Sequence, residues 1–233
     1  MLRATVVMAM ELVTLEGMHV RLEPLERRHA AGLVEASAAD TSIYRWSLVP
    51  VGREAVERYI DTALKWRDAG TALPFATVRK ADGVVIGSTR FWGLERWAWP
   101  EGSADYGKHV YDTGEIGYTW LTASAVRTAA NTEAKLLMLT HAFEVWRMNS
   151  VSFCTDERNE RSAAAIKRIG AKFEGVLRAH RMAADFTPRN TLRFSIVASE
   201  WPEVKRRLRE KLAARANSLY PQGKDREHTR TEE

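Results

Sequence analysis

The stretch RTAANTEAKL, residues 127–136, has the residue types and the position of a phosphate-binding turn. It joins an apolar run, EIGYTWL, to a strongly apolar segment with helical spacing. The first turn of a helix presents unpaired backbone N–H groups at the positive end of the helix dipole. Because the stretch contains no glycine, it either holds an anion through N–H groups at negative φ or is only a capped helix start.

Other residues could carry acid, base or binding chemistry. Glu115 opens EIGYTWL, and His180 ends FEGVLRAH. Imidazole titrates near neutral pH, so His180 is a candidate base, although carboxylates at strand ends and histidines in strands are usually structural. Cys154 lies in a segment that reads as a buried strand, which favours packing over nucleophilic chemistry.

A second group gathers in FWGLERWAWP. An aromatic wall beside one acid would suit a cationic amine next to an apolar group, and a cover over the core or a dimer contact would suit the same residues. The candidate substrate-binding residues of this segment are Trp92, Glu95, Trp97 and Trp99.

The elements that must position these residues read as mixed α/β. Strands are expected at HVRLEPL, FATVRK, VVIGSTRFW, EIGYTWL, NSVSFCT, FEGVLRAH and TLRFSIVAS, with an Asp-Gly hairpin turn after FATVRK. Helices are expected over residues 28–38, 53–69, 132–146, 160–168 and 202–216. Gly117 inside EIGYTWL favours a bulge or a close backbone approach.

Composition limits the class of protein. The chain has 233 residues, 45% of them hydrophobic, and a net charge of +5 with a pI near 9.4. Residues 203–233 hold nine Lys or Arg and six Asp or Glu, so most of the excess charge lies at the end of the chain and a nucleic-acid surface is a weak interpretation. One cysteine excludes an intrachain disulfide, no metal spacing occurs among the histidines, and a cytoplasmic location is expected.

Four segments of the chain are expected. Residues 1–11 read as a flexible leader without a clear cleavage site or membrane span, and 12–201 as a single domain. Residues 202–216 form a C-terminal helix, and 217–233 a disordered charged tail.

The order of elements resembles the GNAT superfamily of N-acetyltransferases, in particular the branch of ribosomal-protein N-terminal (RimJ/RimL-like) acetyltransferases. Four pieces carry the likeness, which spans about residues 12–201: EIGYTWL, RTAANTEAKLLMLTHAFE, NERSAAAIKRIGAKFEGVLR and the final strand ending in SEW. The resemblance implies a GNAT-like central mixed, mostly antiparallel twisted sheet of about six to seven strands flanked by helices. It also implies that the sheet is splayed between the fourth and fifth strands.

The resemblance also implies acetyl-CoA as co-substrate, no metal, and a set of binding residues. Pyrophosphate would lie on the turn, pantetheine along EIGYTWL and Asn159, and the thioester carbonyl near the backbone N–H groups around Leu121. The implied cofactor-binding residues are Leu121, Thr122, Arg127, Thr128, Ala129, Ala130, Asn131, Thr132, Asn159 and Ser162. Alanine keeps the N–H that a family glycine would offer.

Two family positions differ here. A tyrosine that often protonates the leaving thiolate is replaced by Ile166, which leaves Ser162 as the remaining donor. A glutamate that is a candidate base is replaced by Arg181, so Glu115 becomes the first choice and His180 the second.

The sequence therefore predicts direct acetyl transfer from acetyl-CoA to a primary amine, either a protein N-terminus or a small molecule. The alternative is an inactive CoA-binding regulatory or scaffold domain of the same fold. A homodimer fits either hypothesis, and neither calls for a membrane or nucleic acid. A nucleotide-dependent kinase is disfavoured because no G-K-S/T follows the turn.

Overall fold

The computed structural model of the chain describes residues 11–219. It contains one eight-stranded sheet with the strand order β1-β2-β3-β4-β5-β6-β8-β7. Strands run at β1 (Leu15–Glu16), β2 (Val20–Pro24), β3 (Ala72–Arg79), β4 (Val85–Glu95), β5 (Thr113–Leu121), β6 (Ser150–Asp156), β7 (Lys172–Met182) and β8 (Pro188–Val197). All neighbouring strands pair antiparallel except β5 and β6, which are parallel. The mixed, mostly antiparallel sheet of the sequence prediction is confirmed, with one short strand, β1, beyond the expected seven.

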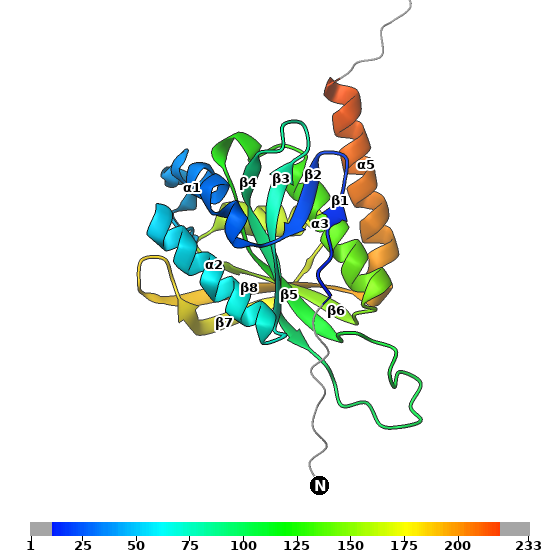
Figure 1. Cartoon of the computed structure of the whole chain (residues 1–233). Coiled ribbons are helices and arrows are strands. Elements are labelled where there is room, and N and C mark those ends of the chain that lie inside the picture. The colour runs from blue at the N-terminus through cyan, green and yellow to red at the C-terminus, as the bar shows by residue number, and fades with distance from the viewer. Residues whose placement is uncertain (1–10, 220–233) are drawn as a thin grey trace, which may run out of the picture.

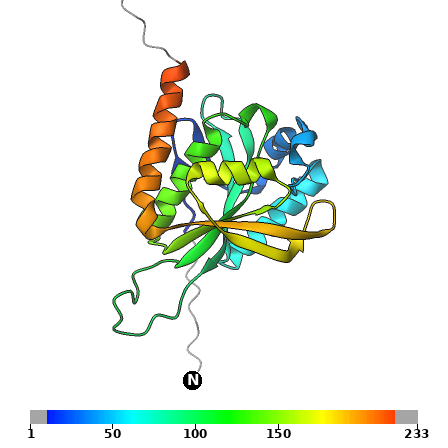
Figure 2. The same cartoon turned by 180° about the vertical axis from the view of Figure 1, so that it is seen from behind.

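Helices cover both faces of the sheet (Figures 1 and 2). The α-helices are α1 (Ala30–Ala38), α2 (Arg53–Asp68), α3 (Ala130–Thr140), α4 (Glu160–Ile169) and α5 (Trp201–Leu219). Shorter helices are η1 (Arg27–His29), η2 (Thr41–Tyr44), η3 (Ala123–Ala125), the π-helical turn η4 (His141–Val145) and η5 (Ala198–Glu200). α5 starts one residue earlier and runs three residues further than the sequence suggested. The expected leader and tail lie outside the described residues, apart from Glu11 and residues 217–219.

The core divides between the two faces. On one face, α3 and α5 bury large side chains such as Met138 and Leu208 against the sheet. On the other, α1 and α2 bury Leu33, Val56 and Ile60. Burial of a large aliphatic side chain contributes about 1.5–3 kcal/mol, so these stripes fix which face each helix covers.

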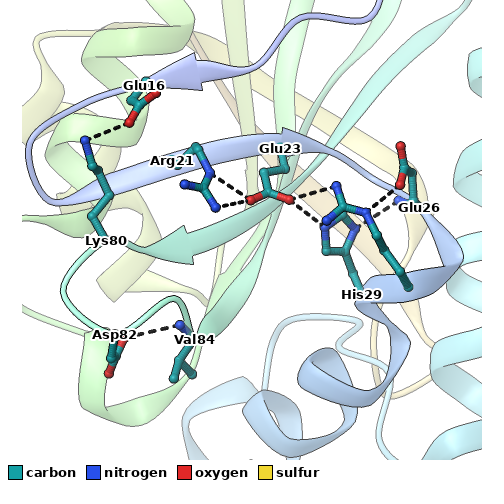
Figure 3. A network of polar contacts seen from close by, with 9 residues as sticks. Glu16, Arg21, Glu23, Glu26, His29, Lys80, Asp82 and Val84 are labelled. Carbon is teal, nitrogen blue, oxygen red and sulfur yellow. Dashed lines mark hydrogen bonds and ion pairs between the residues drawn. The ribbon is translucent and has the colours of Figure 1, made fainter.

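A polar network fixes the entry from β2 into α1 (Figure 3). Glu23, 8% exposed, accepts hydrogen bonds from Arg21 Nε at 2.7 Å and from His29 Nε2 at 3.1 Å. His29 Nδ1 accepts from the backbone N–H of Glu26 at 3.0 Å, which places the ring proton on Nε2. Burial raises the pKa of Glu23, but the bonds from His29 and Arg21 outweigh it and lower that pKa to about 2.

Candidate active site

The two central parallel strands separate after a short paired segment. β5 and β6 pair only at Thr113, Gly114 and Glu115, with Ser150, Val151 and Ser152 as partners. Beyond Glu115 the strand edges diverge, so backbone groups on those edges lack a strand partner. The expected separation between the fourth and fifth strands of the sequence analysis is confirmed here, at β5 and β6.

A bulge lies in β5 just where the strands part. Arg90 of β4 faces Gly117 and Ser88 faces Trp120, so Tyr118 and Thr119 together oppose the single residue Thr89. Tyr118 has φ of 51°, a left-handed conformation that is costly for a non-glycine residue and is often found at functional sites. The sequence predicted a bulge from Gly117, and the structure puts the left-handed residue one position later.

A cavity of about 480 Å³ fills the space between the diverging strands. Its wall draws on β5 and β6, on α4 and on the β7–β8 hairpin. The turn before α3, the first turns of α3, the end of η2 and residues 46–49 complete it. α3 and α4 lie over one face of the sheet (Figure 2), whereas α2 lies over the other (Figure 1). The cavity is lined both by Ile116, which packs in the core under α3, and by Tyr118, which packs on Trp66 of α2, so it reaches both faces of the sheet.

The turn before α3 leaves backbone donors without a partner. The N–H of Ala130 bonds to Thr128 Oγ1 at 3.2 Å, whereas the N–H groups of Ala129, Asn131 and Thr132 have no acceptor among residues 11–219. Ala129 has φ of −68°, so alanine causes no strain there, and Arg127 takes the left-handed conformation instead, with φ of 62°.

Of the turn residues, Arg127 and Asn131 line the cavity. Thr128, Ala129, Ala130 and Thr132 are outside its lining, as is Thr122, whose N–H is bonded to Ile86 O at 2.7 Å. Leu121 lines the cavity, and its carbonyl accepts from Tyr44 Oη at 3.0 Å.

The start of α4 contributes two further predicted residues, Asn159 and Ser162. Asn159 caps the helix, its Oδ1 accepting from Ser162 N at 3.0 Å, and it is 7% exposed. Asn159 Nδ2 and Ser162 Oγ have no hydrogen-bond partner within the described chain, and both residues line the cavity. Ile166, at the position of the family tyrosine, also lines it.

Glu115 lies at the point where the strands separate, on the α2 face. Its Oε2 accepts from Arg181 Nη2 at 3.1 Å, and Arg181 in turn lies 5.3 Å from the ring of Trp92. Trp92 packs on Trp66 of α2 and on Tyr118. Arg181 stands where the family resemblance implies a glutamate base. It forms an ion pair with Glu115, the residue that the sequence analysis proposed as the base instead.

His180, the second candidate base, does not line the cavity near Glu115. It is exposed on β7, whereas its neighbour Arg181 lines the cavity. Burial and the positive charges of Arg181 and Arg189 lower the pKa of His180.

The tryptophan-rich segment also lies elsewhere. Trp97 and Trp99 pack on each other at 5.6 Å and both donate to Asp112, in the loop that projects from the ends of β4 and β5 (Figure 1). Neither residue lines the cavity, and nor does Glu95, which accepts from Thr113 Oγ1 at 3.4 Å. Among the four expected substrate residues, only Trp92 is tied to the cavity, through its contacts with Arg181 and Tyr118.

Sequence reasoning missed Lys135. This residue of α3 is 3% exposed, and its Nζ donates to Thr119 Oγ1 at 2.7 Å and Thr89 Oγ1 at 3.0 Å. Burial lowers its pKa to about 7. The available signal was a lysine four residues after Asn131, on the helix face that meets the sheet.

Cys154 also lines the cavity. Burial, and then the nearby Glu115 carboxylate, raise the pKa of its thiol to about 12. A thiol in this state is a poor nucleophile, in agreement with a packing role. Within residues 11–219 no group of three His, Cys, Asp or Glu side chains could hold a metal ion.

The layered sheet, with its separated central strands and cavity, defines a fold class of acyl-CoA-dependent acetyltransferases. Residues 19–172 match the family model of the acetyltransferase (GNAT) domain, so the chain belongs to this family. No curated protein matches the sequence significantly. Of the helices described, none has the length and apolar character needed to cross a membrane.

Solved structures agree with the family. A protein from T. thermophilus, described as an acetyltransferase, is 35% identical, with a TM-score of 0.70 over 88% of this chain and 100% of that one. A GCN5-related N-acetyltransferase from Brucella melitensis is 28% identical, with a TM-score of 0.75 over 88% and 87% of the two chains. Mycobacterium smegmatis RimJ in complex with CoA-disulfide, 22% identical, shares the fold with a TM-score of 0.68 over 88% and 93%. The protein is an acetyltransferase that uses acetyl-CoA.

Proposed function

We propose that the protein transfers an acetyl group from acetyl-CoA directly to a primary amine, without a covalent enzyme intermediate. The main observation in support is the cavity between β5 and β6, which extends from the N-termini of α3 and α4 on one face of the sheet to Glu115 on the other. Such a passage lets a thioester and an amine approach each other from opposite faces. The thioester supplies the acetyl group, and the chain's own residues bind and exchange protons.

The CoA end would use the donors that the helices leave free. Arg127 and the N–H groups at the start of α3 suit pyrophosphate, because a helix N-terminus favours anions. The unpaired edges of β5 and β6 and the Nδ2 of Asn159 suit the amide groups of pantetheine. The N–H groups near Leu121 would bind the developing oxyanion.

Two residues would move protons. As the amine nitrogen bonds to the acetyl carbon, its proton passes to the Glu115 carboxylate directly or through water, and the carbon–sulfur bond breaks. The thiolate takes a proton through the Ser162 hydroxyl, which regains one from water as it donates, and Glu115 returns its proton to solvent, so that both residues end the cycle as they began it. The geometry favours Glu115 over His180, because Glu115 lines the cavity and His180 does not.

A second function has its own observation in its favour. Ile166 stands where the family tyrosine would donate a proton, and Glu115 is held in an ion pair with Arg181. Both features fit a domain that binds CoA and has lost the chemistry, acting as a regulatory or scaffold module.

Thiol release from acetyl-CoA, measured with a panel of amines beside thermal shift with CoA and with ATP, separates the two functions. Turnover with CoA stabilisation supports transfer, and CoA stabilisation with no turnover on any amine supports the binding module. Stabilisation by ATP alone would contradict both.

Glu115→Gln then tests the assignment of the base, with Glu95→Gln as the matched acid outside the cavity. We expect a fall in kcat of about 10²- to 10⁴-fold for the first variant and little change for the second. Equal activity of the two variants would remove Glu115 from catalysis.

A further inference from the structure

Apart from the buried Lys135, the cations of the cavity wall are arginines, and these fall into two groups. Arg127 comes from the turn before α3, and Arg161 and Arg168 come from α4, on the side where CoA phosphates would lie. Arg181 and Arg189 come from the β7–β8 hairpin, which extends toward the side of α2 (Figures 1 and 2). The second group lies away from the CoA phosphates and needs a separate explanation.

Arg181 and Arg189 are direct partners across β7 and β8, so their side chains share one face of the sheet. That face is the α2 face, since Arg181 reaches both Glu115 and Trp92 there. Like charges directly opposite each other on a sheet are destabilising. An isolated protein gains nothing from this arrangement unless anions balance it.

The acids of the cavity wall balance only part of the charge. Glu115 pairs with Arg181 at 3.1 Å, and Asp156 is held by Arg158 at 2.9 Å. Arg189 donates its Nε to Thr191 Oγ1 at 2.9 Å, and no carboxylate of residues 11–219 comes within 4.0 Å of its guanidinium. Arg189 therefore has no direct carboxylate partner among the described residues, and the charges of Asp156 and Glu115 act on it only from further away.

The surroundings respond to this excess charge. Burial and the charge of Arg181 lower the pKa of Arg189, against the opposing charges of Asp156 and Glu115. Burial and then both arginines lower the pKa of the nearby His180. A half-buried guanidinium without a carboxylate partner is suited to bind an anionic ligand, because a carboxylate matches the geometry of its planar donors.

We propose that the acceptor amine also carries a carboxylate, which Arg189 binds at the end of the cavity opposite the CoA phosphates. This inference rests on the proposed function and names its substrate class. The carboxylate is either the α-carboxylate of a free amino acid or the acidic side chain of a peptide near its N-terminus. The same positive potential disfavours an ammonium, so it favours the neutral amine that attacks the thioester.

Matched acceptors test this directly. Acetyl transfer is measured for amino acids against their amides, and for peptide amides beginning with Asp or Glu against those beginning with Asn or Gln. We expect kcat/KM to be at least about tenfold higher for the anionic member of one of the two series, since a charged hydrogen bond is worth about that much. The series that shows the difference identifies the source of the carboxylate.

Arg189→Gln should bring that ratio to about one, and Arg189→Lys should keep part of it. Arg193→Gln is the control, because Arg193 lies on the same strand, pairs with Glu174 at 2.9 Å and does not line the cavity. It should leave the ratio as in the wild type. A wild-type ratio near one in both series, or equal losses for anionic and neutral acceptors in Arg189→Gln, would overturn the inference.

A binding measurement keeps the inference separate from the proposed function. The N-acetylated acids and N-acetylated amides of the same panel are titrated calorimetrically into the protein saturated with CoA. Turnover of no amine would count against the transferase function alone. Binding of the acids that Arg189→Gln removes would still support the carboxylate site, and absence of any preference for the acids would overturn it.

Discussion

At the scale of single residues, the cavity combines side chains held by the protein with side chains left free for a ligand. Glu115 is fixed by Arg181, and Lys135 is fixed by two threonine hydroxyls. By contrast, Asn159 uses only its Oδ1 within the described chain. Free donors beside fixed charges are what a binding site for a long polar ligand requires.

Asn159→Asp separates binding from helix capping. The aspartate keeps an oxygen for the N–H of Ser162 and adds a favourable charge at the N-terminus of α4, but it removes the Nδ2 donor. We expect an unchanged or slightly higher Tm and a KM for acetyl-CoA raised about two- to tenfold, the worth of one neutral hydrogen bond. An unchanged KM would take Asn159 out of the CoA site.

The buried Lys135 should make the free energy of unfolding depend on pH. Burial lowers its folded-state pKa to about 7 from a usual 10.5, so between these values the unfolded chain binds more protons than the folded chain. The free energy of unfolding therefore increases as the pH rises from about 7 toward 10.5, because the cost of burying a charged Lys135 is progressively lost. Lys135→Met removes the titrating group, so its advantage over the wild type should be largest at or below about pH 7.

Urea denaturation of the wild type and Lys135→Met between about pH 6 and 9.5 measures this difference. We expect the difference in the free energy of unfolding to change by up to about 1.4 kcal/mol per pH unit above about pH 7. A difference that does not vary with pH would show that Lys135 is charged to the same extent in both states.

At the scale of elements, the sequence predicted what local patterns determine. The hairpin at residues 81–83 and the stop of α4 at Gly170, with φ of 109°, were expected on these grounds, whereas the separation of β5 from β6 was expected only from the family resemblance. The ion pair between Arg181 and Glu115 could not be predicted from the sequence, because a bulge between Leu177 and Arg181 shifts the register of β7. Four residue steps of β7 match only two of β8 there, and Ala179 has φ of 45°, so simple alternation along β7 does not tell which residue faces the cavity.

The turn before α3 gives a prediction at this scale. Arg127 adopts φ of 62°, a conformation that favours glycine, so Arg127→Gly should not lower the Tm while it removes a cation from the cavity. We expect the KM for acetyl-CoA to rise several-fold, with a larger rise at low salt because phosphate attraction is screened by ions.

Arg147→Gly is the matched control, since Arg147 has φ of 60° and does not line the cavity. Both variants should respond alike in thermal stability. A KM effect of the same size in both would show that the charge of Arg127 does not contribute to CoA binding.

At the scale of the whole molecule, elements that do not line the cavity stabilise the fold around it. α5 packs on α3 from the side away from the cavity, and Leu208 is 1% exposed there. Sequence periodicity predicted the helix but not its partner, because a single sequence does not show which apolar faces meet. The same limit applied to residues 44–49, which have no regular pattern and were not assigned to the cavity.

Leu208→Ala measures how far α5 stabilises the molecule without shaping the site. Truncation of a buried leucine leaves a cavity and costs about 2–5 kcal/mol, whereas Arg209→Ala on the exposed side of α5 should cost little. CoA at about one hundred times its Kd should add about 2.7 kcal/mol to the wild type by mass action. Because Leu208 lies outside the cavity lining, the same addition is expected for Leu208→Ala, measured by denaturation with and without CoA. A smaller gain in that variant would show that α5 holds the α3 N-terminus in the conformation that binds CoA.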